Sequence, residues 1–496
     1  MAATSNYLAF DLGASSGRAV LGMFDGDRLT LEEIHRFANG PVTIRDHLHW
    51  DAPRLFAEIK SALAKCARRR RALDGIGIDT WGVDYALLSP AGQMLDLPFH
   101  YRDSRTRGMM AEAFHLVPRE EIYERTGIQF MEFNTLYQLL SVATTDRATL
   151  DAAGTLLFMP DLFNYWLTGV KQSEYSIATT SQLYDALRGG WATHLMAKLN
   201  LPAEIMPHVV PPASPVGDLL PEIADGAGLA PAPVVAPACH DTGSAVAAVP
   251  AHGQGWAYIS SGTWSLVGVE VPEPICDTEA LTGNFTNEGG VAGTVRFLKN
   301  VAGLWLVQEC KRTWEARGES VSYEKLTEMA DAAPSRVSFV DPDDPRFAEP
   351  GDMPRRIRDC CAAGGQPVPE STGQIVRCAL ESLALKYRTT LHSLERITGW
   401  PVEVVHVVGG GANNRLLCRL TADITGKPVV AGPAEATAAG NVMVQALARG
   451  RVSSLDQVRR VIAASTPLQQ YDPDPAAGWD DAIGRFEALL ADDTVA

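Results

Sequence analysis

The sequence predicts an α/β protein with two domains of the same design, each a mixed β-sheet flanked by helices. Residues 7–21 and 255–269 share one layout, an apolar run, a small turn of Gly with Ser or Thr, and a second apolar run. After the first strands, apolar residues change from alternating to helical spacing, which is typical of a sheet followed by a covering helix. A chain of 496 residues also exceeds what one hydrophobic core accommodates. The matching segments therefore suggest a duplicated domain with a phosphate chain held between the copies.

The first half of the chain begins with strands and continues mainly in helices. The patterns predict strands near 7–12, 17–24 and 28–37, an amphipathic helix at 52–67, a buried strand at 75–79 and mainly helical structure over 110–200. Residues 202–237 are rich in Pro, Gly and Ala and end in the apolar strand Val234–Ala236, so we interpret them as a connector. A helix is expected at Ala245–Val249, and we place the domain boundary near residue 245.

The second half is expected to repeat that plan. The patterns predict a hairpin at 255–270, helices near 300–316, 373–397 and 437–449, and strands at 402–408 and 428–431. The predicted division is a first domain over 1–245, a second over 246–470, and a C-terminal tail with a helix over 471–496.

Composition and charge narrow the class of partner. Apolar residues make up 46% and charged residues 21% of the chain, as in an ordinary globular protein. The net charge of −16 disfavours a nucleic-acid partner, whose phosphates would be repelled. An anionic substrate then needs Mg²⁺ and backbone dipoles to neutralise it locally. The chain has neither an apolar run long enough for a membrane span nor a signal-peptide pattern, so we expect a cytoplasmic protein.

The eight cysteines are scattered, without a C-x-x-C pair or a histidine at zinc spacing. This pattern favours reduced thiols in the cytosol. Cys360 and Cys361 are adjacent in the sequence, and Cys378 can approach either of them.

The first small turn, within Asp11–Arg18, has the residue types of a phosphate-binding loop. Gly13 and Gly17 permit a close approach of backbone to phosphate. Ser15 and Ser16 can donate hydrogen bonds to it. Asp11 can hold a metal ion through water. The alternative is a plain hairpin turn.

Residues 13–17 also match the G-x-S-x-G elbow of serine hydrolases. That elbow needs a strand–turn–helix arrangement, whereas the residues after Gly17 continue as a strand, so we interpret the match as accidental. A hydrolase would further need a histidine and an acid arranged around Ser15.

Two more glycine-containing turns lie in the second half. Ser260–Thr263 is the partner of the first turn, and is interpreted either as a second phosphate grip or as a β-turn alone. Gly409–Gly411 join an apolar strand to a helix beginning near Arg415, which Asn413 or Asn414 can cap. Three glycines let a flat, bulky group such as adenosine lie against the backbone. The dinucleotide-binding pattern G-x-G-x-x-G is absent here, and the P-loop pattern is absent from the whole chain.

Asp241 lies where the apolar strand of the connector ends and a helix is expected to begin. One interpretation is that its carboxylate is the N-cap of that helix. The other is a carboxylate that accepts a proton from a substrate hydroxyl, which requires no unusual pKa in phosphoryl transfer because the transition state is loose.

Two polar and aromatic segments follow apolar strands, Gly77–Tyr85 and His100–Thr106. Recognition of a polyol needs paired donors and acceptors and a flat apolar wall, which Trp81 can supply. The alternative for Arg102, Asp103 and Arg105 is an ion-pair network without a ligand.

Taken together, these segments resemble the FGGY carbohydrate kinases, which belong to the actin-like, ribonuclease-H-like ATPase superfamily. The resemblance is carried by Asp11–Arg18, Gly75–Tyr85, Tyr101–Thr106, Glu174–Asp185, His240–Thr242, Ser260–Ser265, Leu298–Gln308, Val408–Asn414 and residues 432–436. It covers roughly residues 6–470 in order. The first loop reads Gly-Ala-Ser where many relatives have Gly-Thr, and residues 310–330 and the tail match poorly.

The resemblance implies two ribonuclease-H-like domains that close over MgATP and a ketose, with transfer of the γ-phosphoryl group to the sugar's 1-hydroxyl in the cleft between them. It implies that Asp241 is the catalytic base and that Asp11 is a water-mediated magnesium ligand. The expected sugar-binding residues are Trp81, Gly82, Asp103, His240, Asp241, Thr242 and Asn300. The expected nucleotide-binding residues are Ala14, Ser15, Ser16, Gly17, Arg18, Thr263, Gln308 and Gly410. One alternative is the same chemistry on another ketose, such as L-fuculose, L-xylulose or L-ribulose, and a second is a non-catalytic nucleotide-dependent binder related to actin. The choice between a monomer and a homodimer stays open.

Overall fold

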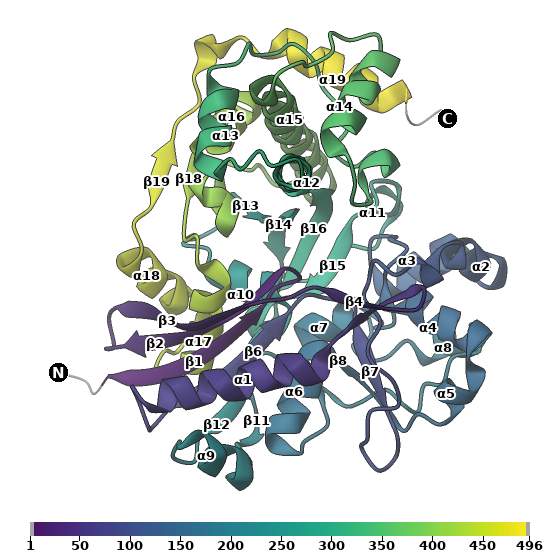
Figure 1. Cartoon of the computed structure of the whole chain (residues 1–496), viewed down its shortest axis with the longest axis vertical. Helices are drawn as coiled ribbons and strands as arrows, with labels where there is room; N and C mark the ends of the chain where they lie inside the picture. Colours follow the sequence, from purple (N-terminus) through teal and green to yellow (C-terminus); the bar gives the residue numbers. More distant parts are fainter. Residues whose placement is uncertain (1–3, 493–496) are drawn as a thin grey trace. The chain divides into compact units, whose positions relative to one another are not determined.

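The computed structural model describes residues 4–492, and it has the predicted α/β class (Figure 1). The chain forms two compact units, and each is assembled from separate stretches of sequence. The first unit comprises residues 4–250, 270–297 and 436–465, and the second comprises residues 251–269, 298–435 and 466–492.

The first unit is built on a six-stranded sheet in the order β11-β12-β6-β1-β2-β3. Its strands are β1 (Ser5–Leu12), β2 (Ser16–Phe24), β3 (Leu29–Ala38), β6 (Gly75–Thr80), β11 (Ser214–Asp218) and β12 (Pro233–Ala236). β1 pairs antiparallel with β2 and parallel with β6, so the sheet is mixed as predicted. Smaller strands in this unit are β4 (Pro41–Ile44), β5 (His47–Trp50), β7 (Tyr85–Leu88), β8 (Thr155–Phe158), β9 (Ser173–Glu174), β10 (Val209–Val210) and β15 (Thr286–Gly289).

The helices of this unit are α1 (Ala52–Ala67), α2 (Met109–Leu116), α3 (Arg119–Thr126), α4 (Thr135–Thr145), α5 (Arg147–Asp151), α6 (Met159–Thr168), α7 (Tyr175–Thr179), α8 (Thr193–Lys198), α9 (Pro221–Ala227), α10 (Asp241–Ala247), α11 (Thr278–Thr282), α17 (Ala436–Ala448) and α18 (Leu455–Ser465). Some of them cover both faces of the sheet. Figure 1 shows α1 and α6 on one side of the sheet and α17 on the other. Glycine permits the close packing of α17, because a Cβ at Gly77 would lie 2.6 Å from Asn441 Oδ1. A Cβ at Gly22 would lie 2.5 Å from Val442.

The second sheet has the order β15-β16-β14-β13-β17-β18-β19, and from β16 onward it repeats this strand plan. Besides β15, its strands are β13 (Trp256–Ser261), β14 (Trp264–Val271), β16 (Val295–Ala302), β17 (Val404–Val408), β18 (Val429–Ala431) and β19 (Gln469–Tyr471). β13 pairs antiparallel with β14 and parallel with β17, as β1 pairs with β2 and β6. The matching hairpins of the sequence therefore occupy equivalent positions in two equivalent sheets.

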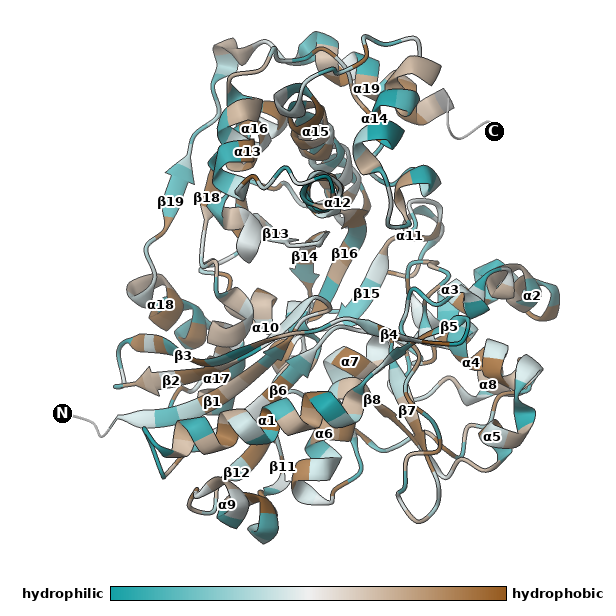
Figure 2. Ribbon diagram, in the orientation of Figure 1, coloured by the Kyte–Doolittle hydropathy of each residue, from teal (hydrophilic) through white to brown (hydrophobic). Residues whose placement is uncertain are grey.

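The helices of the second unit include the longest one of the described chain. They are α12 (Trp305–Ala316), α13 (Tyr323–Asp331), α14 (Met353–Ala363), α15 (Thr372–Thr398), α16 (Arg415–Thr425) and α19 (Asp480–Asp492). At the start of α15, the Ser371 side chain accepts from the Gln374 N–H, and the Gln374 side chain reaches back to the Ser371 backbone. Figure 2 shows hydrophobic residues concentrated along α15, and also along β8 of the first unit, where three of four residues are buried.

Two helix starts differ from the prediction. The helix expected over 300–316 begins at Trp305, because residues up to Ala302 are the end of β16. Gly303 separates the two elements, and its N–H donates to the carbonyl of Thr263 at 3.1 Å. The helix expected at Ala245–Val249 begins four residues earlier, at Asp241.

The structure also bears on membrane-spanning helices and on the state of the cysteines. Within residues 4–492, no helix combines the length and the apolar character that crossing a membrane requires. All eight cysteines are free thiols. The Sγ atoms of Cys361 and Cys378 lie 4.0 Å apart, so Cys378 approaches Cys361 without a disulfide between them.

Candidate active site

Three charged residues lie side by side on neighbouring strands of the first sheet. Asp11 on β1 pairs in register with Asp79 on β6 and with Arg18 on β2. Arg18 donates to Asp11 Oδ2 from Nη2 at 2.7 Å and from Nε at 2.9 Å. Asp79 is fully buried, and its Oδ1 has no hydrogen-bond partner among the described residues. Burial, with the Asp11 carboxylate adding to it, raises the pKa of Asp79 well above its ordinary value.

The turn between β1 and β2 is the first predicted phosphate-binding loop. Its Gly13 N–H donates to the Ser16 carbonyl at 3.0 Å, and the Asn39 side chain donates to the Gly13 carbonyl at 2.8 Å. Ser15 and Ser16 are exposed and Ala14 is partly exposed, so this turn is open to a ligand. A Cβ at Gly17 would lie 2.4 Å from the ring of Phe37, which accounts for glycine at that position.

The element that follows this turn shows whether residues 13–17 form the nucleophile elbow of a serine hydrolase. The residues from Ser16 onward form β2, which pairs antiparallel with β1 from Gly17 to Phe24. The strand–turn–helix geometry of a nucleophile elbow is therefore absent at Ser15. The prediction that the G-x-S-x-G match is accidental is confirmed.

Asp241 is the first residue of α10, and His240 holds the N-cap position without a side-chain capping bond. The interpretation of Asp241 as an N-cap is therefore wrong. Its Oδ1 accepts hydrogen bonds from its neighbour Thr242, from the N–H at 2.5 Å and from Oγ1 at 3.1 Å. The side chain is 30% exposed. Burial raises the pKa of the Asp241 carboxyl, His240 opposes that rise, and the Asp11 carboxylate adds to it.

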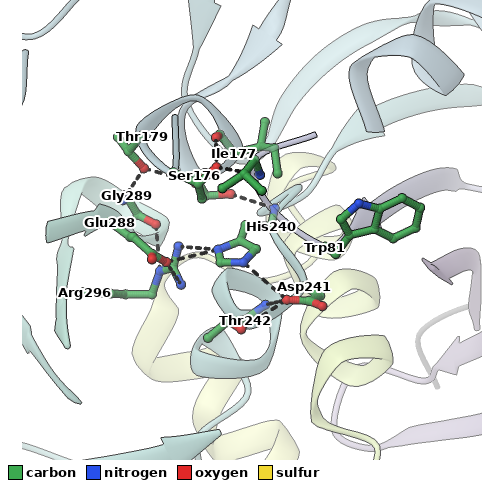
Figure 3. A network of polar contacts seen from close by, with 12 residues as sticks. Trp81, Ser176, Ile177, Thr179, His240, Asp241, Thr242, Glu288, Gly289 and Arg296 are labelled. Carbon is green, nitrogen blue, oxygen red and sulfur yellow. Dashed lines mark hydrogen bonds and ion pairs between the residues drawn. The ribbon is translucent and has the colours of Figure 1, made fainter. Parts of the chain in front are cut away.

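His240 lies between Asp241 and a buried ion pair, as Figure 3 shows. Its Nε2 lies 3.5 Å from Asp241 Oδ1, and its Nδ1 lies 3.1 Å from Glu288 Oε2. A Cβ at Gly82 would lie 3.3 Å from the same Nε2. The structure therefore brings together four of the predicted sugar-binding residues, namely Gly82, His240, Asp241 and Thr242.

Trp81 is held by the carboxylate of Asp84, which lies in the same polar segment and to which the sequence analysis assigned no role. Its Nε1 donates to Asp84 Oδ2 at 2.9 Å, and Trp50 Nε1 donates to the same oxygen at 2.6 Å. The ring centroids of the two tryptophans lie 3.9 Å apart. Gln138 Nε2 donates to Asp84 Oδ1 at 2.8 Å. Burial raises the pKa of Asp84 to about 6, although these hydrogen bonds favour its charged form.

Asp103 is bound by groups of its own chain. Its carboxylate accepts from the Leu48 N–H at 2.7 Å, from the Arg105 N–H at 3.0 Å and from His47 Nδ1 at 3.1 Å. Burial opposes ionisation, but the two N–H bonds and His47 outweigh it and lower the pKa of Asp103. The Arg105 side chain instead donates to Gln138 Oε1 at 2.7 Å and lies over the ring of Phe99.

In the second unit, the turn between β13 and β14 lies against the start of α12. Thr263 Oγ1 donates to Gln308 Oε1 at 3.0 Å, and the Trp305 N–H donates to the Thr263 carbonyl at 3.2 Å. Two predicted nucleotide-binding residues, Thr263 and Gln308, are therefore in direct contact, and both are partly exposed. Asn300 lies on β16 and is also partly exposed.

The glycine run after β17 packs on this same turn. A Cβ at Gly411 would lie 2.0 Å from Ser261 Oγ, and Gly409 has a positive φ of 79°. Gly410 is exposed, and a Cβ there would meet no atom within 4 Å. Asn414 caps α16 by accepting from the Leu417 N–H at 3.0 Å, so of the two predicted capping residues Asn414 is correct.

Five residues of the first unit were not singled out in the sequence, namely Trp50, Gln138, Glu288, Arg296 and Asn441. Asp79, Asp84 and Glu174 lie within the segments that were singled out, but no role was assigned to them. Each is buried, and each binds another polar group of the first unit. Charged residues inside otherwise apolar segments, such as Arg296 before Phe297 and Leu298, are the signal that would have indicated them.

No group of three or more His, Cys, Asp or Glu side chains within residues 4–492 has the geometry of a metal site. The carboxylates of Asp11, Asp79 and Asp241 nevertheless interact electrostatically, since Asp11 raises the pKa of both Asp79 and Asp241, and Asp241 also raises that of Asp79. Oxygen ligands of this kind fit Mg²⁺, which keeps several waters and uses one or two carboxylates together with substrate phosphates.

Comparison with known proteins agrees with the fold of the two units. Residues 6–248 match the N-terminal domain of the FGGY family of carbohydrate kinases, and residues 257–449 match its C-terminal domain. The chain therefore belongs to the FGGY family of carbohydrate kinases. Among its relatives, the rhamnulokinase of Bacteroides thetaiotaomicron is 46% identical over 482 residues, which are 97% of this chain and 99% of the relative. The rhamnulokinase of Pectobacterium atrosepticum is 41% identical and covers 99% of this chain and 98% of its own.

Solved structures share the fold at low identity. A ligand-bound xylulose kinase from Lactobacillus acidophilus aligns with a TM-score of 0.80 at 14% identity, over 98% of this chain and 96% of its own. Plasmodium falciparum glycerol kinase with ADP aligns with a TM-score of 0.76 at 14% identity, over 100% of this chain and 98% of its own. The predicted actin-like fold of sugar kinases is confirmed.

Proposed function

We propose that this carbohydrate kinase transfers the γ-phosphoryl group of ATP to the 1-hydroxyl of L-rhamnulose, giving L-rhamnulose 1-phosphate and ADP in cytoplasmic rhamnose catabolism. The observation that carries the choice of sugar is identity of 40–46% to rhamnulokinases over nearly the whole chain. The polar cluster around Asp241 supports the choice of chemistry, because it holds a partly exposed carboxylate with one oxygen fixed by the protein.

In this proposal Asp241 is the general base. The N–H and the hydroxyl of Thr242 and the ring of His240 all contact Oδ1 of Asp241. Within the described residues, Oδ2 is therefore left for the sugar hydroxyl. The carboxylate orients that hydroxyl and accepts its proton late, because phosphoryl transfer passes through a loose transition state. Burial raises the pKa of the Asp241 carboxyl, which makes its carboxylate a stronger base than that of an ordinary aspartate.

The nucleotide is assigned to the two small turns and to the glycine run. We propose that the backbone of Ala14–Arg18 and the side chains of Thr263 and Gln308 bind the phosphates, and that adenosine lies on Gly410. The open space above Gly410 supports this assignment. We assign the first domain, over 1–245, mainly to the sugar and the second, over 246–470, mainly to the nucleotide.

The sugar is assigned to residues around the base. We propose that Gly82, His240 and Thr242 lie along the ketose, that Asn300 makes a further contact, and that Trp81 is the flat wall. Asp103 stays a proposed sugar contact as well, although three groups of the chain already bind its carboxylate.

Mg²⁺ fits the carboxylates beside the first turn. Asp11 would hold it through water, and the unpartnered buried Oδ1 of Asp79 supports a positive charge near this position. When bound with ATP, the ion neutralises phosphate charge that a protein of net charge −16 would otherwise repel. Arg18 supplies one protein cation beside the same turn.

Product analysis tests the proposed reaction. The purified protein is incubated with MgATP and L-rhamnulose, and the product is examined by ³¹P and ¹³C NMR. We expect a phosphomonoester coupled to C1 and one ADP per ester. ADP release without a sugar ester, or an ester on another carbon, would contradict the proposal.

A further inference from the structure

A buried ion pair lies against His240, on the side of the ring that faces away from Asp241 (Figure 3). Arg296 is fully buried and Glu288 is 5% exposed, and Arg296 Nη1 lies 3.0 Å from Glu288 Oε2. Arg296 Nε also donates to the Gly289 carbonyl at 2.8 Å. Burial opposes ionisation, but the Arg296 guanidinium and His240 outweigh it and lower the pKa of Glu288. Buried ion pairs add little net stability, so stability alone does not account for this one.

Both members of the pair contact the same ring nitrogen. His240 Nδ1 lies 3.1 Å from Glu288 Oε2 and 3.2 Å from Arg296 Nη2. A rotation of the imidazole about its Cβ–Cγ bond would break both contacts. The other ring nitrogen, Nε2, is thereby directed at Asp241 Oδ1, 3.5 Å away.

One short segment around α7 binds the backbone next to both partners of the contact between His240 and Glu288. The Glu174 carboxylate accepts from the Cys239 N–H at 2.9 Å, and the Ser176 hydroxyl accepts from the His240 N–H at 3.0 Å. Thr179 Oγ1 accepts from the Gly289 N–H at 2.8 Å, which ties β15 to α7. His240 and the strand end that carries Glu288 are therefore held to the same element.

We infer that Glu288 and Arg296 are positioning residues of the kinase, which fix the orientation of the His240 ring and, through it, the carboxylate of Asp241. The inference rests on the proposed role of Asp241 as the base. The charges of the guanidinium and the carboxylate cancel. The pair therefore fixes the His240 ring at Nδ1 without adding a net charge to the site. The 3.5 Å distance is long for a hydrogen bond, and such contacts commonly tighten when substrate is bound.

The chain offers a matched control. Glu270 and Arg459 form a second buried ion pair of the first unit, in which Arg459 Nη2 lies 2.6 Å from Glu270 Oε2. Their side chains are 9% and 7% exposed, respectively. Neither residue is a contact of His240. Glu270→Gln and Glu288→Gln therefore make the same chemical change in similar surroundings, and only the second one changes a group on the histidine ring.

The experiment compares Glu288→Gln, Arg296→Lys and Glu270→Gln in the full-length protein. We expect Glu288→Gln and Arg296→Lys to lower kcat with L-rhamnulose by about tenfold or more, with the KM for ATP within about twofold of wild type. Lysine keeps the charge of Arg296, but its single ammonium cannot bind Glu288, the Gly289 carbonyl and His240 together. Glu270→Gln is expected to keep the wild-type kcat, although its thermal midpoint falls as much as that of Glu288→Gln.

The ¹⁵N NMR signals of the His240 ring give a readout that is independent of turnover. They report which ring nitrogen carries a proton, and His240→Asn identifies them by their loss. We expect Glu288→Gln to change these signals and Glu270→Gln to leave them as in wild type. Unchanged ring signals in Glu288→Gln, or an equal loss of kcat in Glu270→Gln, would overturn the inference. A wild-type protein inactive on L-rhamnulose would refute the proposed function, whereas the ring signals would still test the positioning.

Discussion

Asp241 and Thr242 form a closed contact in the first turn of α10, in which one carboxylate oxygen accepts both the N–H and the hydroxyl of the next residue. This contact fixes the carboxylate plane without using both of its oxygens. It also survives replacement by asparagine, whose Oδ1 accepts the same two bonds. The position therefore permits a substitution that removes basicity and little else.

Asp241→Asn is expected to lower kcat by roughly 10²- to 10⁴-fold, the range typical for loss of a general base. The KM for ATP and the thermal midpoint should stay near wild type, because the contacts of Oδ1 are kept. Steady-state kinetics together with a melting curve measure both. Turnover close to wild type would reduce Asp241 to a structural residue.

The activity of the wild-type protein should fall on acidification. Burial raises the pKa of Asp241, and a base with a raised pKa loses its charge at a higher pH than an ordinary aspartate. The midpoint of the acid limb of kcat/KM is therefore expected above about pH 4, the ordinary aspartate pKa. At pH values below that midpoint, kcat/KM should fall about tenfold per pH unit. A profile that stays flat down to pH 4 in folded protein would argue against Asp241 as the base.

Gly410 and Gly411 are neighbours that should respond differently to substitution. A side chain at Gly410 enters open space, so Gly410→Val is expected to keep the thermal midpoint and to raise the KM for ATP by about tenfold or more. A Cβ at Gly411 meets Ser261, so Gly411→Ala should lower stability by roughly 1–3 kcal/mol. Kinetics with varied ATP and varied sugar measure the first effect. Equal increases in both KM values in Gly410→Val would indicate general damage instead.

Asp84 should influence sugar binding through Trp81. Asp84→Asn puts an amide donor where Gln138 now donates, and Gln138 Oε1 is already engaged by Arg105. We expect the KM for L-rhamnulose to rise several-fold while the KM for ATP is unchanged. Trp81→Phe, which keeps a flat ring but removes the indole N–H, is the matched comparison. An unaffected sugar KM in both variants would remove Trp81 from the sugar site.

The duplicated sheets were predictable because each rests on local patterns, such as the alternation and the glycine turn at 7–21 and 255–269. The helix at 52–67 was predicted with its observed bounds for the same reason, since its amphipathic spacing is complete within the segment. The start of α10 was missed because the conformation of Asp241 depends on packing against α17, which is nearly 200 residues away in the sequence.

The sequence indicated the turns that are proposed to bind substrates, but it did not indicate the buried residues that position the site. Thr263 and Gln308 were named and are in contact. Glu288 and Arg296 were not named, because their roles come from long-range contacts with His240. An isolated Glu or Arg in a strand carries no sign of its partner, whereas a glycine turn indicates its function locally.

A coupled assay of ADP release with MgATP across L-rhamnulose, L-fuculose, L-ribulose and L-xylulose tests the central claim most directly. We expect kcat/KM for L-rhamnulose to exceed each of the others by at least about tenfold, a ratio that one pocket contact can supply. A higher kcat/KM for another ketose would contradict the assignment of the sugar while leaving the kinase intact. Absence of any sugar-stimulated ADP release would contradict the account of the active site as a whole.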